Sequence, residues 1–131
     1  MEVRKKQISF LITHYNRPKD LLQCLAAIKS LKVEDSEIVV CDDASLEEHL
    51  KIIQDYETDQ LIVSKTNQGL AANINKGIAA CQGEYIIYCQ EDFLLSPQIS
   101  RILPECLDLL QQGKLDMIRF TSNFAFNKLT S

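Results

Sequence analysis

The sequence lacks the glycine-rich motifs with which the commonest nucleotide-binding folds hold phosphate. It has only four glycines in 131 residues, and neither G-x-G-x-x-G nor G-x-x-x-x-G-K-[ST] occurs in it. A dinucleotide-binding domain needs the first motif and a P-loop enzyme needs the second, because backbone amides of these motifs cradle the phosphate groups. We therefore expect neither class.

Long apolar runs are missing as well. No run approaches the roughly 20 residues of a membrane-spanning helix. The basic residues 4–6 precede an apolar segment, residues 8–13, but this segment is too short for the apolar region of a signal peptide and is followed by polar residues. We interpret it as a strand and expect no transmembrane segment.

Clustered positive charge is also lacking. The formal net charge is -4, from 14 Lys and Arg against 18 Asp and Glu, and residues 4–6 are the only basic cluster. Surfaces that bind nucleic acid normally gather Lys and Arg on one face. We therefore expect no nucleic-acid partner.

The cysteines form no C-x-x-C pair. They are odd in number and scattered, which favours buried free thiols in a reducing cytoplasm over disulfides or a zinc site. The five are Cys24, Cys41, Cys81, Cys89 and Cys106. A cytoplasmic location is the expectation.

What remains is the composition of an ordinary globular protein. Hydrophobic residues make up 46% of the chain and charged residues 24%, which indicates neither disorder nor a fibrous class. The length predicts a single domain over residues 1–131.

Short apolar runs alternate with segments of helical periodicity. The runs predict strands at residues 7–13, 37–41, 61–64, 85–89 and 115–120. The alternation predicts an α/β fold, built from right-handed βαβ units with a mostly parallel sheet. The strand at residues 85–89 carries no charge and is expected to be central, covered on both faces.

Four helices are expected between and after these strands. The first begins at Pro18. The second has a capping box of Ser45 and Glu48, and its residues expected to be buried are Leu46, Leu50 and Ile53.

The third helix carries Leu70, Ile74 and Ile78 on one face, and Gly83 is expected to be its C-terminal cap. The fourth helix has Ser96 as its N-cap and ends near Gly113, with a kink or a new start expected at Pro104.

Two of the predicted strands end in paired acids. Asp42 and Asp43 follow the second strand, and Glu91 and Asp92 follow the fourth. Open α/β sheets bind ligands at the carboxyl ends of their strands. If the first strand lies between these two, the pairs stand about 10 Å apart. A divalent cation would compensate the repulsion between the carboxylates and let the site accept an anionic diphosphate.

Other roles for these residues stay open. Paired acids at strand ends also serve as helix N-caps or as solvated loop residues. His14 could be a metal ligand, but no second His or Cys stands at ligand spacing, so an ordinary loop histidine is expected. His49 is expected on a helix surface.

Four segments, in this order, resemble family 2 glycosyltransferases of the GT-A fold. They are residues 13–17 (Thr-His-Tyr-Asn-Arg), residues 40–45 (Val-Cys-Asp-Asp-Ala-Ser), residues 67–71 (Asn-Gln-Gly-Leu-Ala) with Asn73, Asn75 and Gly77, and residues 83–85 (Gly-Glu-Tyr) leading into Gln90, Glu91 and Asp92. The resemblance covers residues 7–97 and implies a Rossmann-like GT-A fold.

The resemblance implies a nucleotide-sugar site. Thr13 and Tyr15, in the loop that also holds Asn16 and Arg17, would line the base. Asp43 and Asp42 would match the acid that binds the base edge, and Gly69 and Asn73 would pass beside the base and diphosphate. Glu91 would face the ribose, and Asp92 would match the last acid of the D-x-D motif, which binds Mg or Mn.

The function implied is transfer of a hexose from a nucleotide diphosphate sugar, with a UDP-sugar as the expected donor. The acceptor would be a glycan or glycolipid of a cell-surface polysaccharide or glycolipid pathway, and the reaction would be metal-assisted and inverting. The enzyme would be cytoplasmic or at the inner face of the membrane, as a peripheral protein.

The sequence departs from the family pattern at two points. Gln90 replaces the first acid of D-x-D, which removes one charge from the expected metal site. No residue matches the family's general base, so the catalytic residue stays unassigned and the chain is expected to be the N-terminal, donor-binding part of a longer domain. The alternatives are a sugar nucleotidyltransferase, which usually has a glycine-rich loop after its first strand, and a non-catalytic nucleotide-binding or scaffold module.

Overall fold

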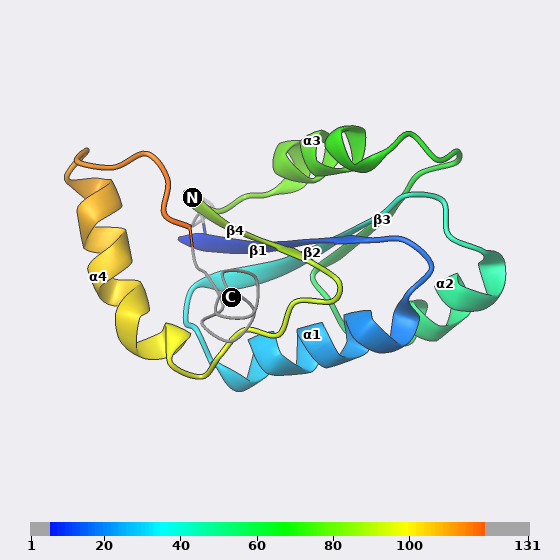
Figure 1. Cartoon of the computed structure of the whole chain (residues 1–131), viewed down its shortest axis with the longest axis horizontal. Coiled ribbons are helices and arrows are strands. Elements are labelled where there is room, and N and C mark those ends of the chain that lie inside the picture. The colour runs from blue at the N-terminus through cyan, green and yellow to red at the C-terminus, as the bar shows by residue number, and fades with distance from the viewer. Residues whose placement is uncertain (1–5, 120–131) are drawn as a thin grey trace, which may run out of the picture. The chain divides into compact units, whose positions relative to one another are not determined.

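A computed structural model describes residues 6–119, which fall into two compact units, one up to Pro97 and one from Gln98. The first unit is a parallel sheet with α3 on one face and α1 and α2 on the other (Figure 1). Its elements in chain order are β1 (Ile8–His14), α1 (Pro18–Ser30), β2 (Ser36–Asp42), α2 (Glu47–Gln54), β3 (Gln60–Val63), α3 (Leu70–Ala80) and β4 (Tyr85–Gln90). The predicted α/β class is confirmed, while the single domain over residues 1–131 stays a prediction.

The sheet has the strand order β3-β2-β1-β4. β1 therefore lies between β2 and β4, as the prediction for the acid pairs required. In the parallel register, His14 is level with Asp42, and Thr13 is level with both Cys41 and Gln90. The residues that follow these strands consequently emerge at one edge of the sheet, the edge at the carboxyl ends of the strands.

The core explains why β1 and β2 form the middle of the sheet. Every residue of β1 is buried, and so is every residue of β2 after Ser36. Leu11, Val39 and Cys41 form a buried cluster on the α3 side. Burying both faces of two adjacent strands is the arrangement expected for continuous apolar runs in a parallel sheet.

Helix α1 follows its prediction closely. Pro18 occupies the first turn, where its missing N–H is tolerated, and Asp20 faces the positive end of the helix dipole. The residues that α1 buries besides Pro18 are Leu21, Cys24, Leu25 and Ile28.

Helix α2 differs from its prediction at the N-terminus. The N-cap is Leu46, and the Leu46 N–H donates to Asn16 Oδ1 (2.8 Å) rather than to a capping-box side chain. Ser45 is engaged elsewhere, with Asp42. Of the three apolar residues expected to be buried, only Ile53 is, and Leu46 is 56% exposed.

Helix α3 presents a different face to the sheet from the one its apolar spacing predicts. Leu70 and Ile78 are 49% and 47% exposed, whereas Asn73 and Gly77 are buried. A Cβ on Gly77 would lie 2.9 Å from Cys41 Sγ and closer still to Leu11. The missing side chain lets the helix approach the sheet, so close packing rather than hydrophobicity selects the buried face.

Two predictions for β4 and the turn before it were wrong. β4 is an edge strand within the described sheet, and Ile86 and Tyr88 are 39% and 36% exposed. Gly83 does not cap α3, since α3 ends at Ala80 with Cys81 as its C-cap. A Cβ on Gly83 would lie 2.5 Å from the backbone nitrogen of Ser9, so the glycine permits the chain to pass close to β1.

The second unit contains α4 (Ile99–Gln111), which runs through Pro104 without ending there. Its N-cap is Gln98 rather than Ser96, and Gly113, at φ +73°, follows its C-terminus in the left-handed conformation that glycine favours. The strand predicted at residues 115–120 is absent from 115–119, and Phe120 lies outside the described residues. An apolar run becomes a strand only where a partner strand accepts its hydrogen bonds, which composition alone does not reveal.

Candidate functional site

A buried hydrogen-bonded group joins the ends of β1 and β2. His14 Nδ1 lies 2.7 Å from Asp42 Oδ1, and both side chains are fully buried. Ser45 donates to the same carboxylate twice, from Oγ to Oδ1 (2.5 Å) and from its backbone N–H to Oδ2 (2.8 Å). His14 is therefore not the loop histidine that we expected, but a residue tied into the sheet edge.

The hydrogen bonds fix the protonation of this group. The Arg17 N–H donates to His14 Nε2 (3.1 Å), so Nε2 is an acceptor, and in the neutral ring Nδ1 carries the proton and donates to Asp42. Burial by itself would raise the pKa of Asp42, but the hydrogen bonds from His14 and Ser45 outweigh it and hold the pKa below its usual range. Asp42 is thus an internal anion whose oxygens are already engaged.

Although it contains a serine, a histidine and an aspartate, this group is not a nucleophilic triad. In a triad the serine hydroxyl donates to the histidine and faces the substrate. Here Ser45 Oγ donates to Asp42, lies 3.4 Å from His14 Nδ1, and is buried. The arrangement organises the loop after β1 rather than activating a hydroxyl.

Asn16 links that loop to α2. Its backbone N–H donates to Ser45 Oγ (2.8 Å), and its Oδ1 accepts from the Leu46 N–H (2.8 Å) and lies 2.9 Å from His49 Nδ1. Asn16 has φ +54°, a left-handed conformation that asparagine tolerates better than most residues. The predicted surface residue His49 is consequently part of the support of this loop.

The other side of the loop is joined to the acids after β4. The Tyr15 N–H donates to Glu91 Oε2 (2.9 Å), and Arg17 Nη1 lies 3.9 Å from Asp92 Oδ2. Burial, and to a smaller extent the charge of Asp92, raise the pKa of Glu91 above its usual range.

A further hydrogen bond joins the ends of β1 and β4. The Oγ1 of buried Thr13 lies 2.8 Å from the Tyr88 hydroxyl oxygen.

The start of α3 approaches the same edge from the opposite face of the sheet. Asp43 accepts hydrogen bonds from the backbone N–H groups of Gln68 (2.8 Å) and Gly69 (3.0 Å). Gly69 is at φ +94°, which favours glycine. Asn73 donates from Nδ2 to the Cys41 carbonyl (2.8 Å), while its buried Oδ1 accepts no hydrogen bond from any described residue. An orphaned buried acceptor of this kind is unusual and marks a place for a donor from water or a ligand.

The structure thus brings the predicted site residues to one edge of the sheet. They arrive on four segments: Thr13, Tyr15, Asn16 and Arg17 at and after the end of β1, Asp42 and Asp43 at the end of β2, Gly69 and Asn73 around the start of α3, and Glu91 and Asp92 after β4. Sequence reasoning missed His14, Ser45 and His49. The available signal for His14 was its position level with Asp42, but that becomes visible only once the strand register is known.

Of the two carboxylates after β4, Asp92 is suited to bind a metal ion that has other ligands as well. Asp92 is about half exposed, and within residues 6–119 no group of three or more His, Cys, Asp and Glu side chains could hold a metal by itself. Mg²⁺ is commonly held by one or two carboxylates together with substrate phosphates and water. The residues present therefore fit a cation that is shared with a phosphate ligand.

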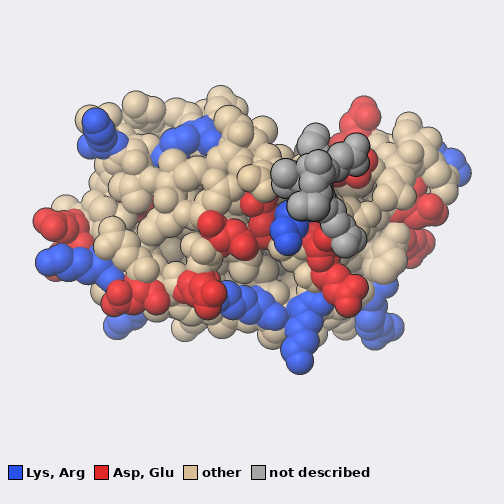
Figure 2. Space-filling model, turned by 180° about the vertical axis from the view of Figure 1, so that it is seen from behind, with Lys and Arg blue, Asp and Glu red and all other residues tan. Residues whose placement is uncertain are grey.

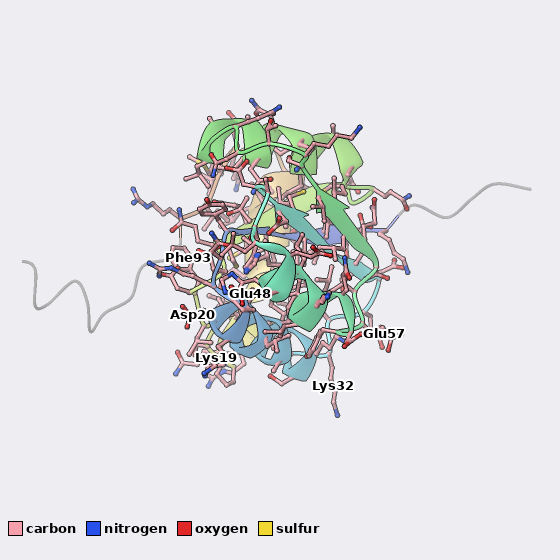
Figure 3. All side chains as sticks on the ribbon, turned by 90° about the vertical axis from the view of Figure 1, so that its right-hand side faces the viewer. Lys19, Asp20, Lys32, Glu48, Glu57 and Phe93 are labelled. Atoms are coloured by element: carbon pink, nitrogen blue, oxygen red, sulfur yellow. The ribbon has the colours of Figure 1, made fainter. Side chains whose placement is uncertain are left out.

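A cavity of about 560 Å³ lies against the outer side of the loop. Figure 3 shows Lys19 and Asp20 at the start of α1, and Glu48 on α2, three of the residues around it. The other residues lining it are Asn16, Arg17, Pro18, His49 and Ile52. The Arg17 side chain beside it is 59% exposed.

Charges of both signs are mixed on the face of the molecule shown in Figure 2. Figure 2 shows Lys and Arg mixed with Asp and Glu over the face in view, without a continuous basic area. The five cysteines are free thiols, but only Cys24, Cys41 and Cys89 are buried as predicted, and Cys81 and Cys106 are half-buried. Among the described residues, the helices are too short or too polar to cross a membrane.

The chain matches the protein family described as Glycosyl transferase family 2 over residues 9–124. No curated protein sequence matches it significantly.

Solved structures share its architecture. The mannosyltransferase PcManGT from Pyrobaculum calidifontis, in complex with GDP-Man and Mn²⁺, has a TM-score of 0.66 at 17% identity, over 77% of this chain and 32% of that one. S. aureus TarS 1-349 in complex with UDP has a TM-score of 0.66 at 21% identity, over 78% of this chain and 32% of that one. The chain thus spans about a third of these proteins, and the likeness confirms the predicted Rossmann-like fold.

Proposed function

Because this chain belongs to glycosyl transferase family 2 and has the GT-A fold, we propose that its carboxyl sheet edge binds a nucleotide diphosphate sugar as donor. The activity served would be transfer of a hexose, with inversion, to a glycan or glycolipid acceptor in cell-surface polysaccharide or glycolipid synthesis. We also propose that the protein is cytoplasmic and acts as a peripheral protein at the inner face of the membrane.

One observation carries this proposal. The loop after β1 is joined on one side to Asp42 at the end of β2, through His14 and Ser45, and on the other side to Glu91 after β4, through the Tyr15 N–H. Three segments that are far apart in the sequence therefore form one connected rim. Such a preformed rim at the ends of parallel strands is where open α/β sheets bind nucleotides.

Each part of the rim has a chemical task in the proposal. Tyr15 is 45% exposed and offers a ring face for the base. Asp43 already accepts two backbone N–H groups, but a carboxylate has about four acceptor positions and can take a further N–H from the base edge. We propose that Asp42, whose oxygens are engaged internally, supports the site rather than touching the base.

The diphosphate side of the donor would lie near Gly69, Asn73, Arg17 and the acids after β4. Asp92 would hold Mg or Mn, and that ion would neutralise the leaving nucleotide diphosphate. Mn²⁺ in the complex of the mannosyltransferase supports the use of a divalent ion, while Asp92 as its ligand rests on its position after β4. Arg17 would add positive charge beside the phosphates, and Glu91 would face the ribose.

Isothermal titration calorimetry of this chain with UDP, GDP and dTDP, each with and without Mn²⁺, tests the proposal. We expect one nucleotide to bind in preference to the others, and its affinity to fall when a chelator removes the metal. Failure of all three nucleotides to bind in the presence of Mn²⁺ would overturn the proposed donor site, and equal binding with and without the ion would overturn the role of Asp92.

A further inference from the structure

We propose that His14 is a positioning residue for the donor site, and that it holds the loop of residues 15–17 in place by accepting the Arg17 N–H at Nε2. The importance of that loop for donor binding rests on the proposed function, but the hydrogen-bond geometry does not. His14 is 1% exposed, so it acts through the loop and not by touching a substrate.

The acceptor role of Nε2 depends on Asp42. The short contact between His14 Nδ1 and Asp42 Oδ1, 2.7 Å, keeps the ring proton on Nδ1 and leaves the lone pair of Nε2 directed at the Arg17 N–H. Ser45 donates two further hydrogen bonds to Asp42. The carboxylate is therefore fixed in position, and it fixes the ring orientation in turn.

The backbone of this loop is held by hydrogen bonds to three other parts of the fold. Its three successive backbone N–H groups each donate to a different element: Tyr15 to Glu91 after β4, Asn16 to Ser45 after β2, and Arg17 to His14 in β1. The Tyr15 residue is 45% exposed and the Arg17 side chain 59%. Fixing the backbone in advance reduces the ordering that a ligand must impose on those two side chains when it binds.

The Arg17 bond also joins the loop to α1. The Arg17 carbonyl accepts the Leu21 N–H (3.0 Å) at the start of that helix. His14 thus holds the point at which the loop becomes helix, one residue before Pro18. If this bond is lost, we expect the loop backbone to open locally while the sheet stays intact.

Two substitutions separate the two nitrogens of His14. In His14→Asn the amide nitrogen can replace the Nδ1 donor to Asp42, but nothing replaces the acceptor at Nε2. In His14→Gln the longer amide can replace the Nε2 acceptor, but the donor to Asp42 is lost. His49→Asn is the control, because His49 contacts the same loop only through the Asn16 side chain.

Amide hydrogen exchange measured by NMR is the first readout. His14→Asn should speed exchange of the Arg17 amide about five- to tenfold, the effect of losing one ordinary hydrogen bond. His14→Gln should change Arg17 exchange less, although it should lower the thermal unfolding midpoint more, because it leaves buried Asp42 short of a donor. If Arg17 exchange merely follows global stability in all three variants, His14 has only a structural role and the proposal is wrong.

The ring nitrogens of the wild-type chain provide a test that needs no variant to fold. The chain has only two histidines, so nitrogen-15 shifts of labelled histidine can be assigned with the His49 variant. A proton on Nδ1 and none on Nε2 of His14 is the tautomer that the hydrogen bonds predict. A neutral ring with its proton on Nε2 would overturn the proposal.

Nucleotide titration distinguishes this proposal from the proposed function. We expect His14→Asn to weaken nucleotide binding about three- to tenfold, because the loss of about one hydrogen bond is shared between binding and loop ordering. If the wild-type chain binds no nucleotide while the exchange results hold, the donor-site proposal fails and the loop-positioning role of His14 stands. If nucleotide binds and His14→Asn leaves its affinity unchanged, His14 does not position the site.

Discussion

Arg17 stands beside two carboxylates that look alike in isolation. One of its nitrogens, Nη1, is 3.9 Å from Asp20 Oδ2 and also 3.9 Å from Asp92 Oδ2, and the two carboxylate side chains are 46% and 45% exposed. Only Asp92 follows β4 at the carboxyl edge of the sheet, whereas Asp20 lies in the first turn of α1. Position in the fold, not local chemistry, gives Asp92 its proposed role.

This pair provides a matched test of the metal site. Asp92→Asn should weaken Mn²⁺-dependent nucleotide binding about tenfold or more, since a contact to a charged group contributes about 1.5–3 kcal/mol. Asp20→Asn removes an equally exposed charge near the same arginine and should change the affinity little. Calorimetry of both variants decides the matter, and equal losses in the two would show a general charge effect instead of a metal ligand.

Glu37 is the buried carboxylate at the other end of the sheet. It accepts from Ser9 Oγ (2.6 Å) and from the Gln82 N–H (2.5 Å). Burial would raise its pKa, but these hydrogen bonds, with one from Gln60, outweigh burial and hold the pKa below its usual range. A carboxyl with a depressed pKa stabilises the fold above its unfolded pKa of about 4.3, and this stabilisation is lost as pH falls through the folded pKa.

Glu37→Gln should therefore lower the free energy of unfolding at pH 7 by about 1–3 kcal/mol, as expected when a buried hydrogen-bonded charge is removed. It should also reduce the loss of stability on going from pH 7 to below pH 4. Urea denaturation at several pH values measures both effects, with exposed Glu34→Gln as the control. An unchanged slope of stability against pH in Glu37→Gln would contradict this account of acid sensitivity.

At the scale of elements, α3 is held to the sheet by a missing side chain. Gly77→Ala gains about 1 kcal/mol of helix propensity, but its methyl group must enter the contact with Leu11 and Cys41. Overpacking of this kind typically lowers stability by about 1–3 kcal/mol, so we expect net destabilisation. Asn75→Ala, on the exposed side of the same helix, gains propensity without a clash and should stabilise slightly. Chemical denaturation of both variants measures the difference, and a more stable Gly77→Ala would show that α3 packs less closely than described.

The same helix shows what the sequence could and could not predict about the fold. The first four strands and α1 were predictable because their apolar patterns are local and strong. The buried face of α3 was not, because Leu70, Ile74 and Ile78 repeat correctly for a core stripe, yet the helix packs through Asn73 and Gly77. Hydrophobic periodicity predicts which residues gain from burial, but it does not predict how closely the backbone of a helix can approach the sheet.

The candidate site divides in the same way. Its acids and its loop were found from sequence because they follow strands in a recognisable order. The support beneath them was not found, because the partners of His14 and Asn16 lie about 30 residues away in the chain, on β2 and α2. Ser45 shows how a local pattern can mislead, since its spacing to Glu48 suggests a helix cap while its hydroxyl in fact donates to Asp42.

At the scale of the whole molecule, the parallel order β3-β2-β1-β4 does the assembling. It places β1 between the two strands that end in acids. Candidate site residues as far apart in the sequence as Thr13 and Asp92 therefore lie at one edge of the sheet. The chain spans about a third of the glycosyltransferase structures that it resembles, and we propose that these residues supply the donor site. The central claim is therefore the location of that site.

Nuclear magnetic resonance with Mn²⁺ tests this location most directly. In a nitrogen-15-labelled chain with the preferred nucleotide bound, Mn²⁺ should broaden the amide signals of residues 15–17, 69 and 91–92, because its unpaired electrons relax nearby protons. Amides near Glu37 and Gly83, at the opposite end of the sheet, should stay sharp. Broadening centred on that opposite end, or spread evenly over the chain, would contradict a donor site at the carboxyl edge.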